Sequence, residues 1–141
     1  MEEAVSHSVL RGRPFGGVGV LLKNKYCDGI KFTVMRERFL ILIFSNTIIV
    51  NIYLPCASSD PSLDVLCDTL AEIESVILSY NGFKLICGGD FNVNLNGNMR
   101  SATIIREFMT KFDLSVCDKS FSSNRNIIDY TFCHDSLGHR S

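Results

Sequence analysis

The sequence lacks several features that would each identify a class of protein. It has no excess of either charge, because 14 lysine and arginine residues stand against 15 aspartate and glutamate residues. The resulting net charge of −1 provides no global basic field for nucleic acid or anionic lipid. There is no internal repeat, linker or low-complexity tract. With 141 residues, of which 46% are hydrophobic and 21% charged, the chain is expected to form one globular domain or part of one.

Cysteine pairs with the spacing of metal or redox sites are also missing. The six cysteines lie far apart, without any C-x-x-C pair, whereas zinc sites and secreted disulfide scaffolds have closer spacings. Several lie inside apolar runs, as buried thiols do. The N-terminal stretch MEEAVSHSVLRGR has no apolar core of a signal peptide. We therefore expect an intracellular protein of the nucleus or cytoplasm, not a secreted one. The cysteines are Cys27, Cys56, Cys67, Cys87, Cys117 and Cys133.

The longest apolar stretch, FLILIFSNTIIVNIYL (39–54), is too interrupted to predict a membrane span. A polar tripeptide breaks it at 45–47, and Asn51 breaks it again. It falls short of the roughly 20 uninterrupted apolar residues that a spanning helix needs. We expect two strands joined at Ser45 and Asn46, and no association with a membrane.

Four β-type runs, rich in Ile, Val and Phe, are predicted in the first part of the chain, at 17–23, 30–35, 39–44 and 47–54.

A helix is predicted after these runs, because apolar residues then recur at steps of three and four and form one stripe. Asp60 is expected to cap its start, with Pro61 at the first helical position and Gly82 closing its end. The stripe consists of Leu63, Leu66, Leu70, Ile73, Ile77 and Tyr80.

Shorter elements are predicted in the remainder of the chain. An apolar strand at 83–88 follows the helix and completes a strand–helix–strand unit. A second helix is expected at about 102–112, with final strands at 114–117 and 127–133. This order predicts an α/β fold, an α+β layered sandwich in which helices cover the outside of sheets.

The stretch KLICGGDFNVN (84–94) places two polar residues directly after a buried strand. If the chain stays extended past the glycines, Asp90 and Asn92 project to the same side and Phe91 turns into the core. Such a pair suits phosphodiester hydrolysis, because the carboxylate can orient or deprotonate water and the amide can bond the developing oxyanion. Taken alone, however, the pair favours a simple turn.

Two other apolar strands also carry polar residues. Asn51 and Tyr53 share one face of their strand, where they either serve a site or satisfy the backbone of a neighbouring loop. Asp129 interrupts the run IIDYTF (127–132), and a carboxylate there is costly to bury unless it is paired. It would orient a histidine, as the acid of a triad does, or form a salt bridge to a residue such as Arg125.

Together, these strand ends resemble the exonuclease–endonuclease–phosphatase superfamily, which has the fold of pancreatic DNase and the abasic-site endonucleases. The resemblance rests on NIYLP (51–55), GDFN (89–92) and IDY (128–130), which follow the family's order. The stretch GRPFGGVGV (12–20) is similar to the endonuclease domain of LINE-type (non-LTR) retroelements, which precedes a reverse transcriptase.

The resemblance implies a DNase-like four-layer fold that is incomplete. It covers residues 12–133, with tails at 1–11 and 134–141. The family's metal-binding Glu and its final Ser-Asp-His element have no counterpart here, so the metal ligands are unknown and His134 is expected in a solvated tail. We therefore expect a fragment that lacks both ends of the active site and has little or no nuclease activity alone.

Roles for individual residues follow from the same resemblance. Asp90 would activate water and Asn92 would bind the scissile phosphate. Tyr53 would contact the phosphate, Asn51 would hold the strand end at the substrate, and Asp129 would orient a catalytic histidine. The family depends on Mg²⁺, which polarises the phosphate and stabilises the leaving oxygen. The implied substrate is DNA, as in target-site nicking by retroelements, and no stable protein partner is expected.

Three alternatives remain open. The chain would be a non-catalytic remnant or interaction module of the same fold, or a phosphodiesterase that acts on phosphoinositides or sphingomyelin. The third is a calcium-binding loop, because Asn92, Asn94, Asn96 and Gly97 imitate the start of an EF-hand. Thr103 stands where that loop requires a bidentate Glu.

Overall fold

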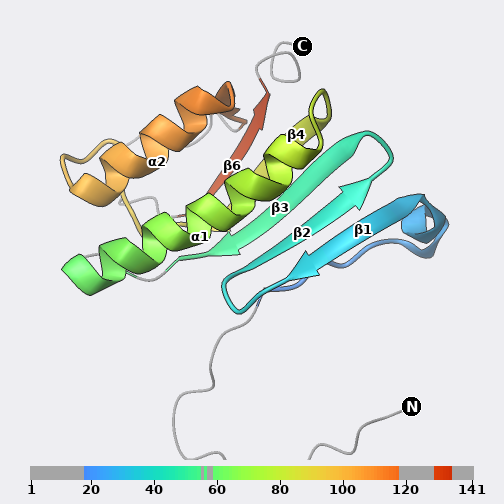
Figure 1. Ribbon diagram of the computed structural model, residues 1–141, viewed down its shortest axis with the longest axis horizontal. Coiled ribbons are helices and arrows are strands. Elements are labelled where there is room, and N and C mark those ends of the chain that lie inside the picture. Colours follow the sequence, from blue (N-terminus) through green and yellow to red (C-terminus); the bar gives the residue numbers. More distant parts are fainter. Residues whose placement is uncertain (1–17, 55, 57–58, 118–128, 135–141) are drawn as a thin grey trace, which may run out of the picture.

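A computed structural model describes residues 18–54, 56, 59–117 and 129–134, and the structural statements below concern these residues. They form a six-stranded sheet of order β1-β2-β3-β4-β6-β5. Two helices, α1 (Asp60–Ser79) and α2 (Arg100–Lys111), lie on one face of the sheet (Figure 1). The strands are β1 (Ile30–Met35), β2 (Phe39–Phe44), β3 (Thr47–Tyr53), β4 (Lys84–Asp90), β5 (Leu114–Val116) and β6 (Asp129–His134).

The first three strands form an antiparallel meander, as the β-branched runs predict. β2 and β3 are joined at Ser45 and Asn46, where Ser45 adopts a φ of 54°. Every residue of β2 except Phe44 is buried, which explains why its sequence is apolar without alternation. The apolar stretch at 39–54 is thus a hairpin. No helix in the described part of the chain is long and apolar enough to cross a bilayer.

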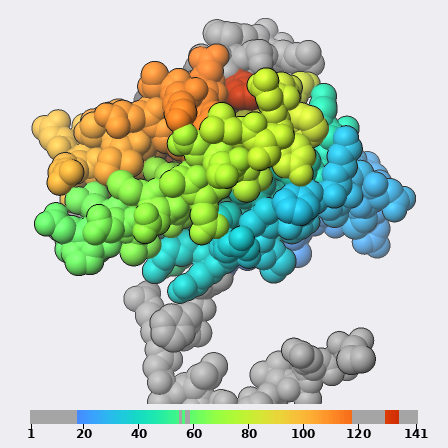
Figure 2. Space-filling view, viewed as in Figure 1, coloured from blue at the N-terminus to red at the C-terminus, as the bar shows by residue number. Residues whose placement is uncertain are grey.

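Helix α1 connects β3 to β4, and these two strands run parallel. Its predicted stripe is confirmed, since Leu66, Leu70, Ile73 and Ile77 are buried in the same core cluster as the inward residues of β3. Each such side chain contributes about 1.5–3 kcal/mol when fully buried. Figure 2 shows α1 and α2 packed side by side over this face of the sheet. The predicted α/β class is therefore confirmed, with one sheet layer and one helix layer described.

The start of α1 differs from the expectation by one residue. Ser59 is the N-cap, and Asp60 is the first helical residue. The Ser59 hydroxyl bonds the Ser62 hydroxyl at 2.8 Å, while no side chain caps a backbone N–H. A carboxylate in the first turn still interacts favourably with the helix dipole, so Asp60 suits this position. Gly82 follows the helix with a φ of 84°, in the left-handed region that glycine tolerates.

The strand predicted at 17–23 is wrong for the residues that the structure describes. Residues 18–23 belong to no strand and lead into a short 3₁₀ helix at Asn24–Gly29. A side chain of β3 bonds this segment to the sheet instead, because Asn51 Nδ2 donates to the Gly19 carbonyl at 2.8 Å. β propensity alone does not make a strand when no neighbouring ladder accepts it.

Two boundaries also differ from the sequence prediction. Helix α2 begins at Arg100 and ends at Lys111, so it starts and ends earlier than predicted. The described part of the last strand begins at Asp129, and residues 127–128 lie outside the described chain.

Burial of Cys87 in the middle of β4 gives the first prediction. Its thiol is 1% exposed, and burial raises its pKa from 9.0 to about 12. At pH 8 we expect iodoacetamide to alkylate the exposed Cys27, Cys56 and Cys67 in the native protein, and Cys87 only after unfolding. Mass spectrometry of peptides after timed alkylation measures this difference. Alkylation of Cys87 at the rate of Cys27 would contradict the buried position of β4.

The same pKa shift predicts how stability depends on pH. The unfolded thiol loses its proton near pH 9.0, whereas the folded one keeps it to about pH 12. The unfolded state therefore binds fewer protons between these values, so the contribution of Cys87 is complete below pH 9 and is lost as pH rises toward 12.

Candidate active site

The polar residues predicted on separate strands meet at one end of the sheet. Tyr53 ends β3 and Asp90 ends β4, and the parallel register pairs them directly. Asp129 begins β6 and pairs with Asp90 from the other side. These three residues, the strand-end row, span two strand spacings, or about 10 Å. Because paired residues share a face, Tyr53 and Asp90 lie on the face opposite the helices.

Gly89, the residue before Asp90, allows β3 and β4 to approach closely at the row. Gly89 has a φ of 131°, and a Cβ placed on it would lie 2.0 Å from the Ile52 carbonyl oxygen. Directly after the row, Phe91 turns into the core and packs its ring on Phe132 with centroids 5.1 Å apart. Phe91 is 2% exposed, so the prediction that it faces the core is confirmed.

Asp90 and Asn92 form a turn that joins the ends of β3 and β4. Asn92 has a φ of 48°, so the chain does not stay extended and the geometry assumed from the sequence is wrong. The Asn92 backbone N–H donates to Asp90 Oδ1 at 2.9 Å, and its Nδ2 donates to the Leu54 carbonyl at 2.6 Å. Leu54 N–H donates in turn to the Asp90 carbonyl at 2.9 Å. Both side chains are thereby fixed where β3 and β4 end.

The second carboxylate oxygen of Asp90 is not completely buried. Only Oδ1 takes part in a hydrogen bond among the described residues. No buried side-chain oxygen or nitrogen in that part of the chain lacks a partner, so Oδ2 is not buried. A carboxylate with one oxygen fixed and the other without a hydrogen-bond partner can accept a proton from water or bind a cation.

Tyr53 and Asn51 differ in their availability to a ligand. The Tyr53 side chain is 38% exposed, and the structure records no hydrogen bond for its hydroxyl among the described residues. Asn51 lies two residues further into the sheet than Tyr53, between Leu40 and Gly88, and its Nδ2 donates to the Gly19 carbonyl. Asn51 therefore positions the segment at 18–23 beside the row.

Arg38, which was not among the predicted site residues, extends the row by one strand. The Tyr53 backbone N–H donates to the Arg38 carbonyl at 2.8 Å, so Arg38 stands opposite Tyr53 just before β2. The sequence contains a signal for it, because Arg38 has the parity of Leu40, which pairs with Asn51. Arg38 directly precedes an apolar run, whereas Tyr53 and Asp90 end theirs.

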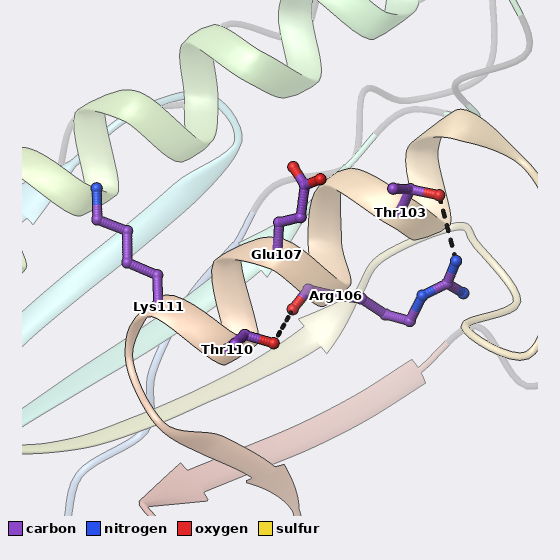
Figure 3. A pocket seen from close by; sticks show the side chains of 5 residues that line it. All are labelled: Thr103, Arg106, Glu107, Thr110 and Lys111. Atoms are coloured by element: carbon purple, nitrogen blue, oxygen red, sulfur yellow. Dashed lines mark hydrogen bonds between the residues drawn. The ribbon is translucent and has the colours of Figure 1, made fainter.

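The loop after Asn92 is fastened to α2 by Arg106. Its Nη1 donates to the Leu95 carbonyl at 2.6 Å and to the Gly97 carbonyl at 3.1 Å, and its Nη2 donates to the Thr103 hydroxyl at 3.2 Å. Figure 3 shows Arg106 turned back toward Thr103. From the other side, the Tyr130 hydroxyl accepts the Leu95 N–H at 3.0 Å. The loop that follows the candidate site is thus held from two sides, by Arg106 of α2 and by Tyr130 of β6.

Replacing Arg106 by alanine is expected to loosen this loop. Losing exposed, charge-assisted hydrogen bonds should cost about 1 kcal/mol of unfolding free energy. We expect faster amide exchange at Leu95 and Gly97 with little change in the sheet, measured by hydrogen–deuterium exchange. Arg100→Ala, at an exposed position of the same helix, is the matched control and should leave both amides unchanged. Equal exchange in the two variants would show that Arg106 does not hold the loop.

His134 is part of the sheet and does not lie in a solvated tail. It ends β6, is half-buried, and its Nδ1 accepts the Leu85 N–H at 3.3 Å. Its distance from Asp129 along the strand is about 17 Å. His134 is therefore not a histidine that Asp129 could orient.

The described residues supply only part of a metal site. Among them, no group of three or more His, Cys, Asp or Glu is placed to hold a metal ion. The Arg106 guanidinium occupies the Leu95 and Gly97 carbonyls, which opposes a calcium site in that loop. Mg²⁺ takes one or two carboxylates together with waters and substrate phosphate oxygens. Oδ2 of Asp90, which has no hydrogen-bond partner among the described residues, fits one position of such a set.

Comparisons with known proteins agree with this geometry at the level of the fold. No protein-family model and no characterised protein matches the sequence. The structure matches the endonuclease domain of TRAS1, a telomere-specific non-LTR retrotransposon, with a TM-score of 0.57 and 12% identity over 79% of this chain and 57% of that one. The chain has a DNase-like fold.

Two structures of NExo from Neisseria give the same result. One is the 3′ phosphatase bound to a product DNA hairpin, with a TM-score of 0.56, and the other is the 3′–5′ exonuclease from Neisseria meningitidis, with a TM-score of 0.53. Each is 10% identical over 73% of this chain and 54% of its own. The resemblance to the exonuclease–endonuclease–phosphatase superfamily is thus confirmed for the fold. The chain spans just over half the length of these structures.

Proposed function

We propose that this chain is a nuclease-like domain whose strand-end row acts on DNA phosphodiester bonds with Mg²⁺. The observation that carries the proposal is the meeting of Tyr53, Asp90 and Asp129 at one end of the sheet. Ligands of α/β sheets bind outside the carboxyl ends of parallel strands, where β3 and β4 end here. The proteins of matching fold are described as an endonuclease domain, an exonuclease and a phosphatase with product DNA, which supports DNA as the substrate.

The contacts within the row suggest how its residues divide the work. Asp90 Oδ2 would orient or deprotonate the attacking water, because Oδ1 is held by the Asn92 N–H and keeps the carboxylate in place. The Asn92 amide, held at Leu54, and the Tyr53 hydroxyl would bond phosphate oxygens. Asp129 would orient an imidazole. When bound at Asp90, Mg²⁺ would neutralise developing charge on the phosphate.

The extent of activity is a further part of the proposal. Asp90 would be the base, and Asn92 and Tyr53 would be the phosphate contacts. Among the described residues, no histidine lies beside Asp129 and no group of three or more His, Cys, Asp or Glu could hold a metal ion. We expect weak cleavage, because each missing group would lower transition-state stabilisation. Target-site nicking, as in retroelements, is the reaction class that we propose. A non-catalytic DNA-binding module is the alternative that the same row supports.

The test is nicking of supercoiled plasmid by the 141-residue chain in Mg²⁺ and in EDTA, with DNA binding measured in parallel by fluorescence anisotropy. We expect slow nicking in Mg²⁺ and no nicking in EDTA. Binding without any nicking would favour the non-catalytic module. A folded chain that neither binds nor nicks DNA would overturn the proposal.

A further inference from the structure

Arg38 stands at the open end of the strand-end row. The hydrogen bond from Tyr53 N–H to the Arg38 carbonyl extends the β2–β3 ladder one residue beyond the pair of Phe39 and Ile52. Phe39 is 2% exposed and faces the helices, so alternation places Arg38 on the other face, with Tyr53 and Asp90. It lies one strand spacing, about 5 Å, from Tyr53 and about 10 Å from Asp90.

The two arginines of this turn are used differently. Arg36 Nε forms an ion pair with Glu72 of α1 at 3.0 Å, and its Nη1 donates to the Met35 carbonyl. Arg36 is thus neutralised on the helix side of the sheet. Arg38 is half-buried, and the described part of the chain holds no ion pair or hydrogen bond to its guanidinium. A guanidinium is always charged, so a partly desolvated one is stabilised by an anion.

We propose that Arg38 forms a binding subsite for a phosphate group, the one that flanks the scissile phosphate of a polynucleotide. The inference rests on the proposed function, since it assigns a second phosphate of the same substrate. The two N–H groups of a guanidinium fork match two phosphate oxygens. Strand β3 lies between Arg38 and Asp90, so Arg38 would bind a different phosphate from the one at Asp90. It also supplies positive charge beside carboxylates, which by themselves repel a polyanion. The subsite explains how a chain with a net charge of −1 engages DNA locally.

The experiment compares salt dependence of binding in two charge-matched variants. Binding of a fluorescein-labelled oligonucleotide to the full chain is measured by anisotropy in EDTA between 50 and 200 mM salt. Each neutralised phosphate contributes about one unit to the slope of log K against log salt. Arg38→Gln should make this slope less steep by about one unit. When salt rises from 50 to 200 mM, the affinity of the variant should therefore fall by a factor that is roughly threefold to fourfold smaller than for the wild type. Arg36→Gln, with the same change in charge two residues away, should keep the wild-type slope.

Two further arms make the outcomes distinct. Arg38→Lys should restore the slope but not the full affinity, because an ammonium keeps the charge without the fork. Inorganic phosphate at constant ionic strength should compete weakly if the subsite needs the polymer, and strongly if it is a general phosphate site. Circular dichroism confirms that each variant is folded.

Equal slopes for Arg38→Gln and Arg36→Gln, in a wild type that binds DNA, would overturn the subsite and leave the proposed function standing. Strong competition by inorganic phosphate would overturn its assignment to a polynucleotide. Failure of the folded wild type to bind any oligonucleotide would overturn both proposals.

Discussion

Replacing Asp90 by asparagine is expected to remove Mg²⁺-dependent nicking of supercoiled DNA while leaving the fold unchanged. Asparagine keeps an oxygen at the position of Oδ1, so it can still accept the Asn92 N–H that closes the turn. It loses the negative charge and the basicity that the proposed role requires. General-base catalysis contributes about 10²–10⁴-fold, so the rate should fall by at least two orders of magnitude. Conversion of supercoiled to open-circular plasmid, followed on agarose gels, measures the rate.

The control for this prediction is Asp64→Asn, an identical chemical change at an exposed position on α1. It should nick as the wild type does, because α1 covers the opposite face of the sheet. If Asp90→Asn also retains the wild-type rate, Asp90 is not the base. In that case the activity comes from other residues or from a co-purified nuclease.

Replacing Gly89 by alanine is expected to cause a large loss of stability. The residue has a φ of 131°, and its Cβ would lie 2.0 Å from the Ile52 oxygen and 2.9 Å from the Ile52 nitrogen. Both atoms belong to the backbone of β3, so no side-chain rotation can relieve the contact. Strain and overlap together should cost about 3 kcal/mol or more, a large part of the 5–15 kcal/mol that stabilises a typical domain. Urea denaturation followed by circular dichroism gives the difference.

Gly82→Ala separates the steric cost from the backbone cost. Gly82 also has a positive φ, 84°, but no atom lies within 4 Å of a Cβ placed there. Its replacement should cost about 1–2 kcal/mol, the ordinary penalty for a non-glycine residue in the left-handed region. If the two alanine variants lose equal stability, the close approach of β3 and β4 at Gly89 is not what requires glycine.

The elements that follow local patterns could be predicted from the sequence. The stripe of α1 and the β-branched runs of β2 and β3 depend on spacing within a few residues, and the structure confirms them. The segment at 18–23 has the same β-type composition but belongs to no strand, because a ladder needs a neighbour that composition does not specify.

The candidate site was predictable in its members more than in its geometry. Side-chain alternation along each strand identified Asn51, Tyr53 and Asp129 as unusual, but the direct pairing of Tyr53 with Asp90 depends on tertiary register. From the sequence, a turn and a site were competing explanations for Asp90 and Asn92. In the structure, a turn places both side chains at the row, because the Asn92 φ of 48° returns its amide to Leu54. The roles of these residues in catalysis remain predictions.

The register of the row also has a consequence for folding kinetics. Tyr53 and Asp90 are brought together by one strand–helix–strand unit, in which β3, α1 and β4 follow one another along the chain. Asp129 joins them only when β6 returns from beyond α2 and β5 to pair with β4. Closing this second, separate loop carries its own entropic cost, and non-local pairing is intrinsically slow. We therefore expect Tyr53 and Asp90 to come together first during folding, and Asp129 to complete the row in a later step of sheet assembly.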